Sequence, residues 1–273
     1  VGLGDVYKRQ DKTYTVYRDF TVEVNPGDVV YITGDSGSGK SILLKDLAQQ
    51  IEKCEEFGGV IREEDLKIDP DEVLIESVGR DTKEAIETLS QAGLNDAYIF
   101  LRRYRELSDG QKYRYKIAKM IDSNRGTWIL DEFCATLDRT TAKVVAYCIQ
   151  KAARRRGRTL IAATTHEDLA EDLNPTIHIH KKLGSEASIK YTPYQPKECT
   201  ILKDVKIREA SREEFKKLEQ FHYKGTLPKL TSKIYAAYVK EELAGVIAYT
   251  TPIFSCRGRN IALPQYKPTK PYK

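Results

Sequence analysis

The octapeptide Gly-Asp-Ser-Gly-Ser-Gly-Lys-Ser at residues 34–41 constrains the fold of this chain more than any other segment. It fits the pattern Gly-x-x-x-x-Gly-Lys-Ser/Thr, whose backbone N–H groups surround phosphates, while the lysine reaches the outer phosphates and the final hydroxyl holds Mg²⁺. The apolar run 29–33 predicts a buried strand before it, and Ile42, Leu43 and Leu47 predict the apolar face of a helix after it. The N-terminus of that helix favours the phosphates of a nucleoside triphosphate. We expect the nucleotide to contact Gly34, Asp35, Ser36, Gly37, Ser38, Gly39, Lys40, Ser41 and Ile42.

Four further segments follow this loop along the chain. They are Leu-Ser-Asp-Gly-Gln at 107–111, Trp-Ile-Leu-Asp-Glu at 128–132, Ala-Thr-Leu-Asp at 135–138 and Thr-Thr-His at 164–166. In this order they resemble the signature, Walker B, D-loop and switch-histidine motifs of the ABC-type ATPases, over roughly residues 14–182. The resemblance implies an α/β fold of the P-loop NTPase type, with ATP as the nucleotide and Mg²⁺ as its metal ion.

The resemblance also implies roles for individual residues. Ser41 and Asp131 are expected to hold Mg²⁺. Glu132 is expected to orient or deprotonate the attacking water, and His166 to sense the γ-phosphate. Such roles suit phosphoryl transfer, which is catalysed mainly by positioning and charge neutralisation. Without the phosphate loop upstream, the two adjacent carboxylates would fit the N-cap of a helix at least as well.

The signature-like segment predicts that two copies of the chain act together. In the family that it resembles, this motif serves the nucleotide of a second protomer, so Ser108 and the amide of Gly110 would cap the γ-phosphate on the partner's loop. Gln111 and Asp138 are also expected to contact nucleotide. Asp109 replaces a glycine of the motif, and the sequence leaves open whether its carboxylate points toward the phosphates. The expected assembly is a head-to-tail homodimer that encloses two ATP molecules and separates after hydrolysis.

Other features of the family are weak in this sequence. A Q-loop glutamine, which normally follows a strand between the phosphate loop and the signature, is not identifiable. The segment 72–76 lies at about that place, but it carries Glu76. The interval between the two motifs is short, so much of the helical subdomain that docks on membrane partners is expected to be missing. Tyr14 and Tyr17 are candidates for an aromatic platform under adenine, but many surface tyrosines would look the same, so the sequence leaves the stacking residue open.

Composition narrows the class of protein further. No run approaches the ~18 apolar residues that span a bilayer. Five cysteines form no close pair, which favours reduced thiols in the cytoplasm over a disulfide framework. A net charge of +5 is mild and does not by itself indicate a nucleic-acid partner. Basic residues alternate with tyrosines over 102–119, where helical spacing favours a solvated face, and nucleic-acid binding stays open as a possibility.

The chain is expected to divide into four regions. Residues 1–10 follow no element pattern and are expected to be non-native or the edge of a fragment, and 11–182 form the ATPase domain. Residues 183–203, which are interrupted by prolines, are expected to be a linker, and 204–273 to form a second, partial domain.

The second domain is predicted to have the element order β-α-β-β. Its elements are a strand at 205–207, a helix opened by a capping box at Ser211, and strands at 233–239 and 243–249. This pattern resembles the beginning of a GNAT-type acetyltransferase over about residues 204–260 and implies a partial α+β domain. No glycine-rich acyl-CoA loop is recognisable, so acetyltransferase activity is not expected from this chain. A small accessory or dimerisation domain is the alternative.

The sequence thus predicts a cytoplasmic ABC-type ATPase that pairs through ATP and regulates or assists a fused acetyltransferase-like domain. Two alternatives stay open, namely the ATP-binding subunit of a membrane transporter and a nucleic-acid-associated ATPase switch. His178 and His180 share one face of a predicted strand. A polar strand face is favoured there over a metal site, because no third ligand is evident.

Overall fold

The computed structural model describes residues 16, 20–221, 227, 230–251, 260–261 and 264–266. The chain divides into two units, Val1–Ile201 and Leu202–Lys273. The segment 1–10 and the two candidates for stacking on adenine, Tyr14 and Tyr17, lie outside the described residues.

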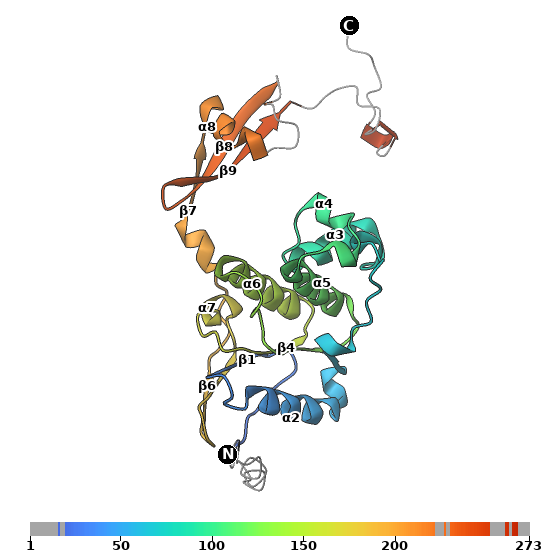
Figure 1. The fold of residues 1–273 in the computed structure, drawn as a ribbon, viewed down its shortest axis with the longest axis vertical. Helices are drawn as coiled ribbons and strands as arrows, with labels where there is room; N and C mark the ends of the chain where they lie inside the picture. The colour runs from blue at the N-terminus through green and yellow to red at the C-terminus, as the bar shows by residue number, and fades with distance from the viewer. Residues whose placement is uncertain are drawn as a thin grey trace, which may run out of the picture. The chain divides into compact units, whose positions relative to one another are not determined.

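A six-stranded sheet forms the centre of the first unit (Figure 1). Its strands, in spatial order, are β2 (Val60–Arg62), β3 (Thr127–Leu130), β4 (Thr159–Ala163), β1 (Val29–Thr33), β5 (Ile177–Lys181) and β6 (Ala187–Tyr191). The first five run parallel, and β6 pairs antiparallel with β5. Every residue of β1, β3 and β4 is buried, as expected for parallel strands covered on both faces. The predicted α/β architecture is confirmed for this unit.

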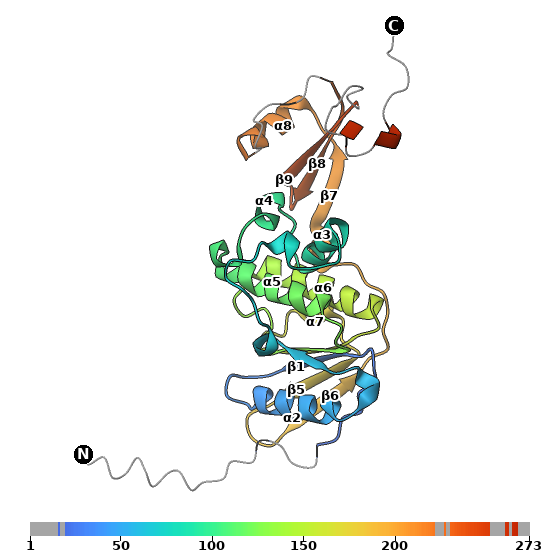
Figure 2. The same ribbon diagram turned by 90° about the vertical axis from the view of Figure 1, so that its right-hand side faces the viewer.

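Helices cover both faces of this sheet. They are α2 (Lys40–Glu52), α3 (Thr82–Gln91), α4 (Ala97–Phe100), α5 (Asp109–Asp122), α6 (Arg139–Arg155) and α7 (Ala170–Leu173), with 3₁₀ turns at Glu55–Phe57, Glu63–Asp65, Leu74–Glu76, Tyr104–Glu106 and Thr200–Asp204. Helix α2 lies on one side of the sheet, and α5 and α6 lie on the other (Figure 1, Figure 2). Neighbouring residues of β1 face opposite sides, so Ile32 packs in the apolar cluster with α2, and Tyr31 in the cluster with α5 and α6.

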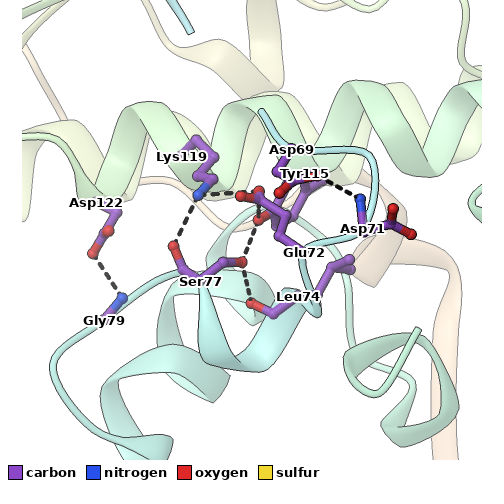
Figure 3. A network of polar contacts seen from close by, with 9 residues as sticks. All are labelled: Asp69, Asp71, Glu72, Leu74, Ser77, Gly79, Tyr115, Lys119 and Asp122. Atoms are coloured by element: carbon purple, nitrogen blue, oxygen red, sulfur yellow. Dashed lines mark hydrogen bonds and ion pairs between the residues drawn. The ribbon is translucent and has the colours of Figure 1, made fainter. Parts of the chain in front are cut away.

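The segment 69–79 is attached to α5 by a polar network rather than by a strand (Figure 3). The ammonium group of Lys119 contacts the carboxylate of Glu72 at 3.1 Å and donates a hydrogen bond to the backbone oxygen of Ser77 at 2.9 Å. The phenol of Tyr115 donates to Glu72 and also bonds to the hydroxyl of Ser77. Burial raises the pKa of Tyr115, so its hydroxyl stays protonated. The network fixes one flank of α5, the helix that begins at the signature.

The region expected to be a linker, 183–203, contains ordered elements of the first unit. Strand β6 extends the sheet at its edge, pairing Ile189 with Ile179 of β5. The N–H and the hydroxyl of Thr200 both donate to the buried carboxylate of Asp172, each at 2.7 Å. The division between the units falls at residues 201 and 202. Prolines around 193–196 suggested a linker, but β-pairing before them and the Asp172 contacts after them tie this segment to the sheet.

The second unit contains a three-stranded antiparallel sheet with a helix against it. Its elements are β7 (Val205–Glu209), α8 (Arg212–Leu218), β8 (Thr231–Val239) and β9 (Glu242–Thr250), with 3₁₀ turns at Glu219–Phe221 and Pro264–Tyr266. Along the chain these elements follow the predicted order β-α-β-β. In the sheet the strands lie in the order β7-β8-β9. Phe215 of α8 is buried together with Ile234 and Ala236 of β8. Lys240 and Glu241 both have positive φ angles, as a tight hairpin turn requires.

Candidate functional site

The phosphate loop leaves β1 and enters α2, which confirms the predicted strand–loop–helix unit. Leu43 and Leu47 are buried as predicted, but Ile42 was wrongly placed on the apolar face, because it lies in the first turn of α2 with its side chain exposed. Three of its glycines adopt backbone angles that other residues rarely tolerate, with φ of 140° at Gly34, 74° at Gly37 and 94° at Gly39. A Cβ atom at Gly34 would lie 2.0 Å from the backbone oxygen of Lys181, so only glycine fits there. The conformation of the loop therefore depends on its glycines, as a backbone nest for phosphates does.

Two polar side chains of this loop are buried. The ammonium group of Lys40 donates hydrogen bonds to the backbone oxygens of Gly34 at 2.8 Å and Asp35 at 2.6 Å. Burial lowers the pKa of Lys40, while the carboxylates of Asp131 and Asp35 act in the opposite direction, so Asp131 lies beside the loop. The hydroxyl of Ser38 is buried without a hydrogen-bond partner in the part of the chain that the structure describes. Such an atom needs a reason, and a phosphate oxygen that accepts its hydrogen bond would supply one.

Asp131 and Glu132 follow β3 as an exposed pair of carboxylates. The N–H of Glu132 donates to the Asp131 carboxylate at 2.9 Å. Glu132 has a φ of 49°, a left-handed conformation that costs a residue with a side chain on the order of 1–3 kcal/mol. The turn is held in place by the N–H of Cys134, which donates to the buried phenol oxygen of Tyr113 at 2.9 Å. Strain of this kind is concentrated at functional sites, because the surrounding structure has to maintain it.

Residues 164–168, here called the switch loop, follow β4. In the sheet, β4 lies between β3 and β1. Parallel neighbouring strands end at one edge, so the phosphate loop, Asp131 and His166 converge there, as ligand sites in α/β sheets do. The N–H of His166 donates to the hydroxyl of Thr164 at 3.3 Å, and its backbone oxygen accepts a hydrogen bond from the phenol of Tyr31.

The signature residues Ser108 and Gln111 form a capping box at the start of α5. The N–H of Gln111 donates to the Ser108 hydroxyl at 3.4 Å, and the N–H of Ser108 donates to the Gln111 side chain at 3.0 Å. Asp109 is exposed in the first helical turn, where the helix dipole favours a carboxylate. The helix dipole therefore explains why an aspartate is tolerated at this position, and the side chain of Asp109 faces solvent. A Cβ at Gly110 would lie 3.2 Å from the Leu137 side chain, so the signature packs closely on the D-loop.

Asp138, at the end of the D-loop, is the N-cap of α6. Its carboxylate accepts a hydrogen bond from the N–H of Thr141 at 2.9 Å. Hydrogen bonds from Thr141 lower the pKa of Asp138, so the carboxylate is ionised throughout the neutral range. Within one chain, Asp138 therefore has the structural role of an N-cap.

Comparisons with known proteins agree with this arrangement. Residues 17–135 match the ABC transporter family. Over this stretch the first unit is similar to ABC transporter ATPase domains, and it is called the ATPase domain below. The cytochrome c biogenesis ATP-binding export protein CcmA of Colwellia psychrerythraea is 27% identical over 183 residues, which cover 56% of this chain and 80% of that protein. The methionine import ATP-binding protein MetN of Streptococcus agalactiae is 24% identical over 283 residues, covering 86% of this chain and 77% of that protein.

The fold of the ATPase domain is also that of a solved cassette. The dimeric structure of MJ0796, a bacterial ABC transporter cassette, superposes with a TM-score of 0.52 at 18% sequence identity, over 68% of this chain and 94% of the cassette. Among the described residues of the present chain, no helix has the length and apolar character needed to cross a membrane.

The ATPase domain has a pocket beside Asp131 whose other charged residues were not selected as site residues from the sequence. The pocket has a volume of about 390 Å³ and is lined by Leu44, Lys45, Ala48, Arg62, Glu63, Glu64, Lys116, Ile129 and Asp131. Of the predicted site residues, Asp131 lines it. Glu63 and Lys116 form an ion pair at 2.6 Å, which joins the end of β2 to the signature helix α5.

The strand that precedes the Q-loop position is β2, and not the segment 72–76 that the sequence suggested. The segment 72–76 forms a 3₁₀ turn at Leu74–Glu76, and it does not lie in the sheet. The strand between the phosphate loop and the signature is β2, which pairs with β3 so that Arg62 lies opposite Ile129. Two glutamates, Glu63 and Glu64, follow it. A strand of three residues carries too little periodicity to be recognised in the sequence.

The histidines of β5 take part in hydrogen bonds within the ATPase domain. Both rings contact the hydroxyl of Thr33, at 2.9 Å from His178 and 3.2 Å from His180. The described residues contain no group of three or more side chains that could hold a metal ion. The contacts with Thr33 give both imidazoles polar partners on this face of the strand.

Most of the basic residues near the signature already have partners in the ATPase domain. Lys116 and Lys119 are paired with glutamates, and the guanidinium of Arg114 donates to the backbone oxygen of Gly93 at 2.7 Å. Tyr113 and Tyr115, which alternate with these cations, are buried. The tyrosines therefore cannot serve as an exposed stacking platform, and the nucleic-acid interpretation loses its main support.

Proposed function

We propose that this chain binds ATP with Mg²⁺ and hydrolyses the nucleotide, and that two copies close over two ATP molecules. The observation that carries the proposal is the convergence of the phosphate loop, Asp131, Glu132 and the switch loop at one edge of the sheet. The family match and the glycine-dependent loop support ATP as the nucleotide.

The phosphate loop provides the binding energy in this proposal. Lys40 would exchange its bonds to the loop carbonyls for the β- and γ-phosphates, and Ser38 would donate its free hydroxyl proton to a phosphate oxygen. Ser41 and Asp131 are exposed and offer hydroxyl and carboxylate oxygens, the ligands that Mg²⁺ prefers. Mg²⁺ bound there would neutralise charge on the phosphates.

In this proposal, the carboxylate of Glu132 and the side chain of His166 carry out hydrolysis at the same edge of the sheet. Glu132 would orient the attacking water and accept a proton from it as the water oxygen bonds to the γ-phosphorus. The bond between the γ-phosphorus and the bridging oxygen breaks, and ADP and inorganic phosphate are released. His166 would hold an oxygen of the γ-phosphoryl group. The strained backbone at Glu132 supports this role, since the fold maintains an unfavourable backbone conformation at the residue that carries the carboxylate.

The signature would complete the site of a second copy. Ser108 and the first amides of α5 stand at the exposed start of a long helix, where partial positive charge favours phosphate. The cassette of similar fold was solved as a dimer, which supports pairing here. Asp109 faces solvent, and this removes the objection that its carboxylate would repel the phosphates within its own chain.

The second unit would respond to the opening and closing of this dimer. Its β-α-β-β order supports a GNAT-like domain, which the ATPase would regulate or assist. We propose this coupling between ATP hydrolysis and the second unit because the two units lie in one chain. If acetyl transfer by a chain that carries this unit proved independent of ATP and of Lys40, the coupling would be refuted.

A second candidate function is the energising of a membrane partner. Its support is that two relatives are an ATP-binding export protein and an ATP-binding import protein. The alignment to MetN covers 86% of this chain, whereas the first unit ends at residue 201 of 273, so the alignment reaches into the second unit. Tyr98 of α4 and Leu101 at its C-terminal end are both more than half exposed and offer an apolar surface for such a partner.

The test is light scattering of the Glu132→Gln variant with Mg²⁺ and ATP. This change removes the proton acceptor and keeps the shape of the side chain, so ATP should remain bound and a dimer should accumulate. The same variant with ADP is the control and should remain monomeric. A variant that binds ATP but never pairs would refute the dimer, and one that binds no ATP would refute the proposed function as a whole.

A further inference from the structure

Tyr31 is an unexpected residue at the centre of the sheet. It lies in the middle of β1, with β4 and β5 as neighbours, and its side chain is fully buried. Its ring packs in the apolar cluster that contains Trp128, Leu160 and Leu169. A buried phenol is unfavourable unless its hydroxyl has a hydrogen-bond partner. That partner is the backbone oxygen of His166, in the switch loop.

We propose that Tyr31 is a positioning residue, which holds the switch loop so that the His166 side chain meets the γ-phosphoryl group. The inference rests on the proposed ATPase function and adds a residue that the sequence analysis did not select. Tyr31 does not touch the nucleotide in this proposal. It acts through the backbone of His166.

The tyrosine itself is held in one position. Its ring stacks on the imidazole of His178, with ring centres 5.3 Å apart and planes inclined by 29°. His178 is fixed in turn by its contact with the Thr33 hydroxyl at 2.9 Å. Thr33 is the last residue of β1, immediately before the phosphate loop. One cluster therefore joins the backbone that enters the phosphate loop to the backbone of the switch loop.

The proton on the Tyr31 hydroxyl is permanent under physiological conditions. Burial, and next the charge of Asp168, raise the pKa of Tyr31 far above the neutral range. The hydroxyl is consequently a donor whenever the protein is folded. A backbone oxygen can only accept, so the polarity of this bond is fixed.

The other side-chain attachments of the switch loop are more exposed. Glu167 contacts His180 at 3.1 Å, with 61% of its side chain accessible to solvent. Asp168 pairs with Arg139, and both side chains are more than 40% accessible. Exposed ion pairs of this kind contribute little, because water and salt screen them. Among the described residues, the bond from the buried Tyr31 is therefore the side-chain contact from outside the switch loop that fixes where the His166 backbone lies.

The deciding variant is Tyr31→Phe, which keeps the ring and its packing and removes the hydroxyl. We expect kcat for ATP hydrolysis to fall about tenfold, while KM and the affinity for ATP stay within about twofold, because the phosphate loop is untouched. Amide hydrogen exchange over residues 164–168 should accelerate. The matched control is Tyr115→Phe, which removes an equally buried phenol whose partners are Glu72 and Ser77 (Figure 3). It should lower stability and leave both kcat and exchange of the switch loop near wild type.

The outcomes separate the positioning role from the proposed function. If Tyr31→Phe loses stability as Tyr115→Phe does but keeps its kcat, Tyr31 only fills the core and the positioning role is refuted. A rise in KM that matches the fall in kcat would refute it as well. A wild-type chain that hydrolyses no ATP would refute the proposed function. The positioning role has its own test in that case. If amide hydrogen exchange over residues 164–168 were the same in Tyr31→Phe as in the wild type, the Tyr31 hydroxyl would not hold the switch loop.

Discussion

The two halves of the proposed composite site are supported in different ways. At the edge of the sheet, Lys40 and Tyr31 are buried, and hydrogen bonds to backbone atoms fix both side chains. At the start of α5, Ser108 and Asp109 are exposed, and the capping box bonds Ser108 to Gln111 of the same helix. The first half is organised within one chain. The second half is a surface whose partner, in our proposal, is another copy of the chain.

This difference separates variants by the step that they should affect. Changes at the sheet edge should alter nucleotide binding or turnover in a monomer. Changes at the start of α5 should leave binding by a monomer intact and alter pairing. A variant at the start of α5 that weakened ATP binding by the monomer would break the comparison.

The largest effect is expected for Lys40→Ala. Removal of the ammonium group that bonds to two carbonyl oxygens of the loop should weaken ATP binding by at least about 100-fold, in line with the strength of charge-assisted bonds to phosphate. Isothermal titration calorimetry with Mg²⁺ and ATP measures the loss. Lys53→Ala, at the exposed C-cap of α2, removes the same charge from the same helix and should bind normally. Equal losses in the two variants would show that general charge, and not the loop, attracts the nucleotide.

An intermediate effect is expected for Ser108→Ala. The variant loses the cap of α5, which should lower the free energy of unfolding by about 1 kcal/mol. It also loses the hydroxyl proposed to reach the partner's γ-phosphate, so turnover should fall about tenfold, while ATP affinity of the monomer is retained. Equilibrium unfolding, calorimetry and light scattering give the three readouts.

Ser211→Ala is the matched control for that variant. Ser211 forms a capping box with Glu214 at the start of α8, in the second unit. It should show a similar loss of stability and unchanged ATP-dependent pairing. If Ser108→Ala paired normally with ATP, the start of α5 would be a capping box and nothing more.

The same two halves show how far the sequence could predict this protein. The strand 29–33, the loop and the helix after it were predictable because glycine spacing and apolar periodicity are local signals. Strand β2 and the pocket beside Glu63 were not, since a three-residue edge strand is defined by its pairing with β3. Tyr31 was read as one apolar residue of a buried strand. Its hydroxyl has a partner 135 positions away in the chain, and no local pattern encodes that contact.

The smallest effect concerns an exposed contact of the sheet-edge half, the pair between Asp168 and Arg139. Hydrogen bonding to Arg139 lowers the pKa of the Asp168 carboxylate below its ordinary value of about 3.9. The folded state thus binds this proton less readily than the unfolded state, so the pair stabilises the fold at pH values above the ordinary pKa. That contribution is lost as the pH falls through the lower pKa of the folded state. Because both side chains are more than 40% exposed, we expect only about 0.5 kcal/mol at pH 7.

The variant Asp168→Asn measures this contribution as a difference from the wild type. Urea unfolding at pH 7 should show the wild type slightly more stable, and the gap should close below about pH 4, where the carboxylate is protonated in the unfolded chain. Raising the salt concentration at pH 7 should narrow the gap too, because exposed charges are screened. A gap of several kcal/mol, or one that persists in acid, would mean that this pair rather than Tyr31 holds the switch loop. The exposed ion pair would then be the stronger attachment of the switch loop, and the bond from the buried Tyr31 the weaker one.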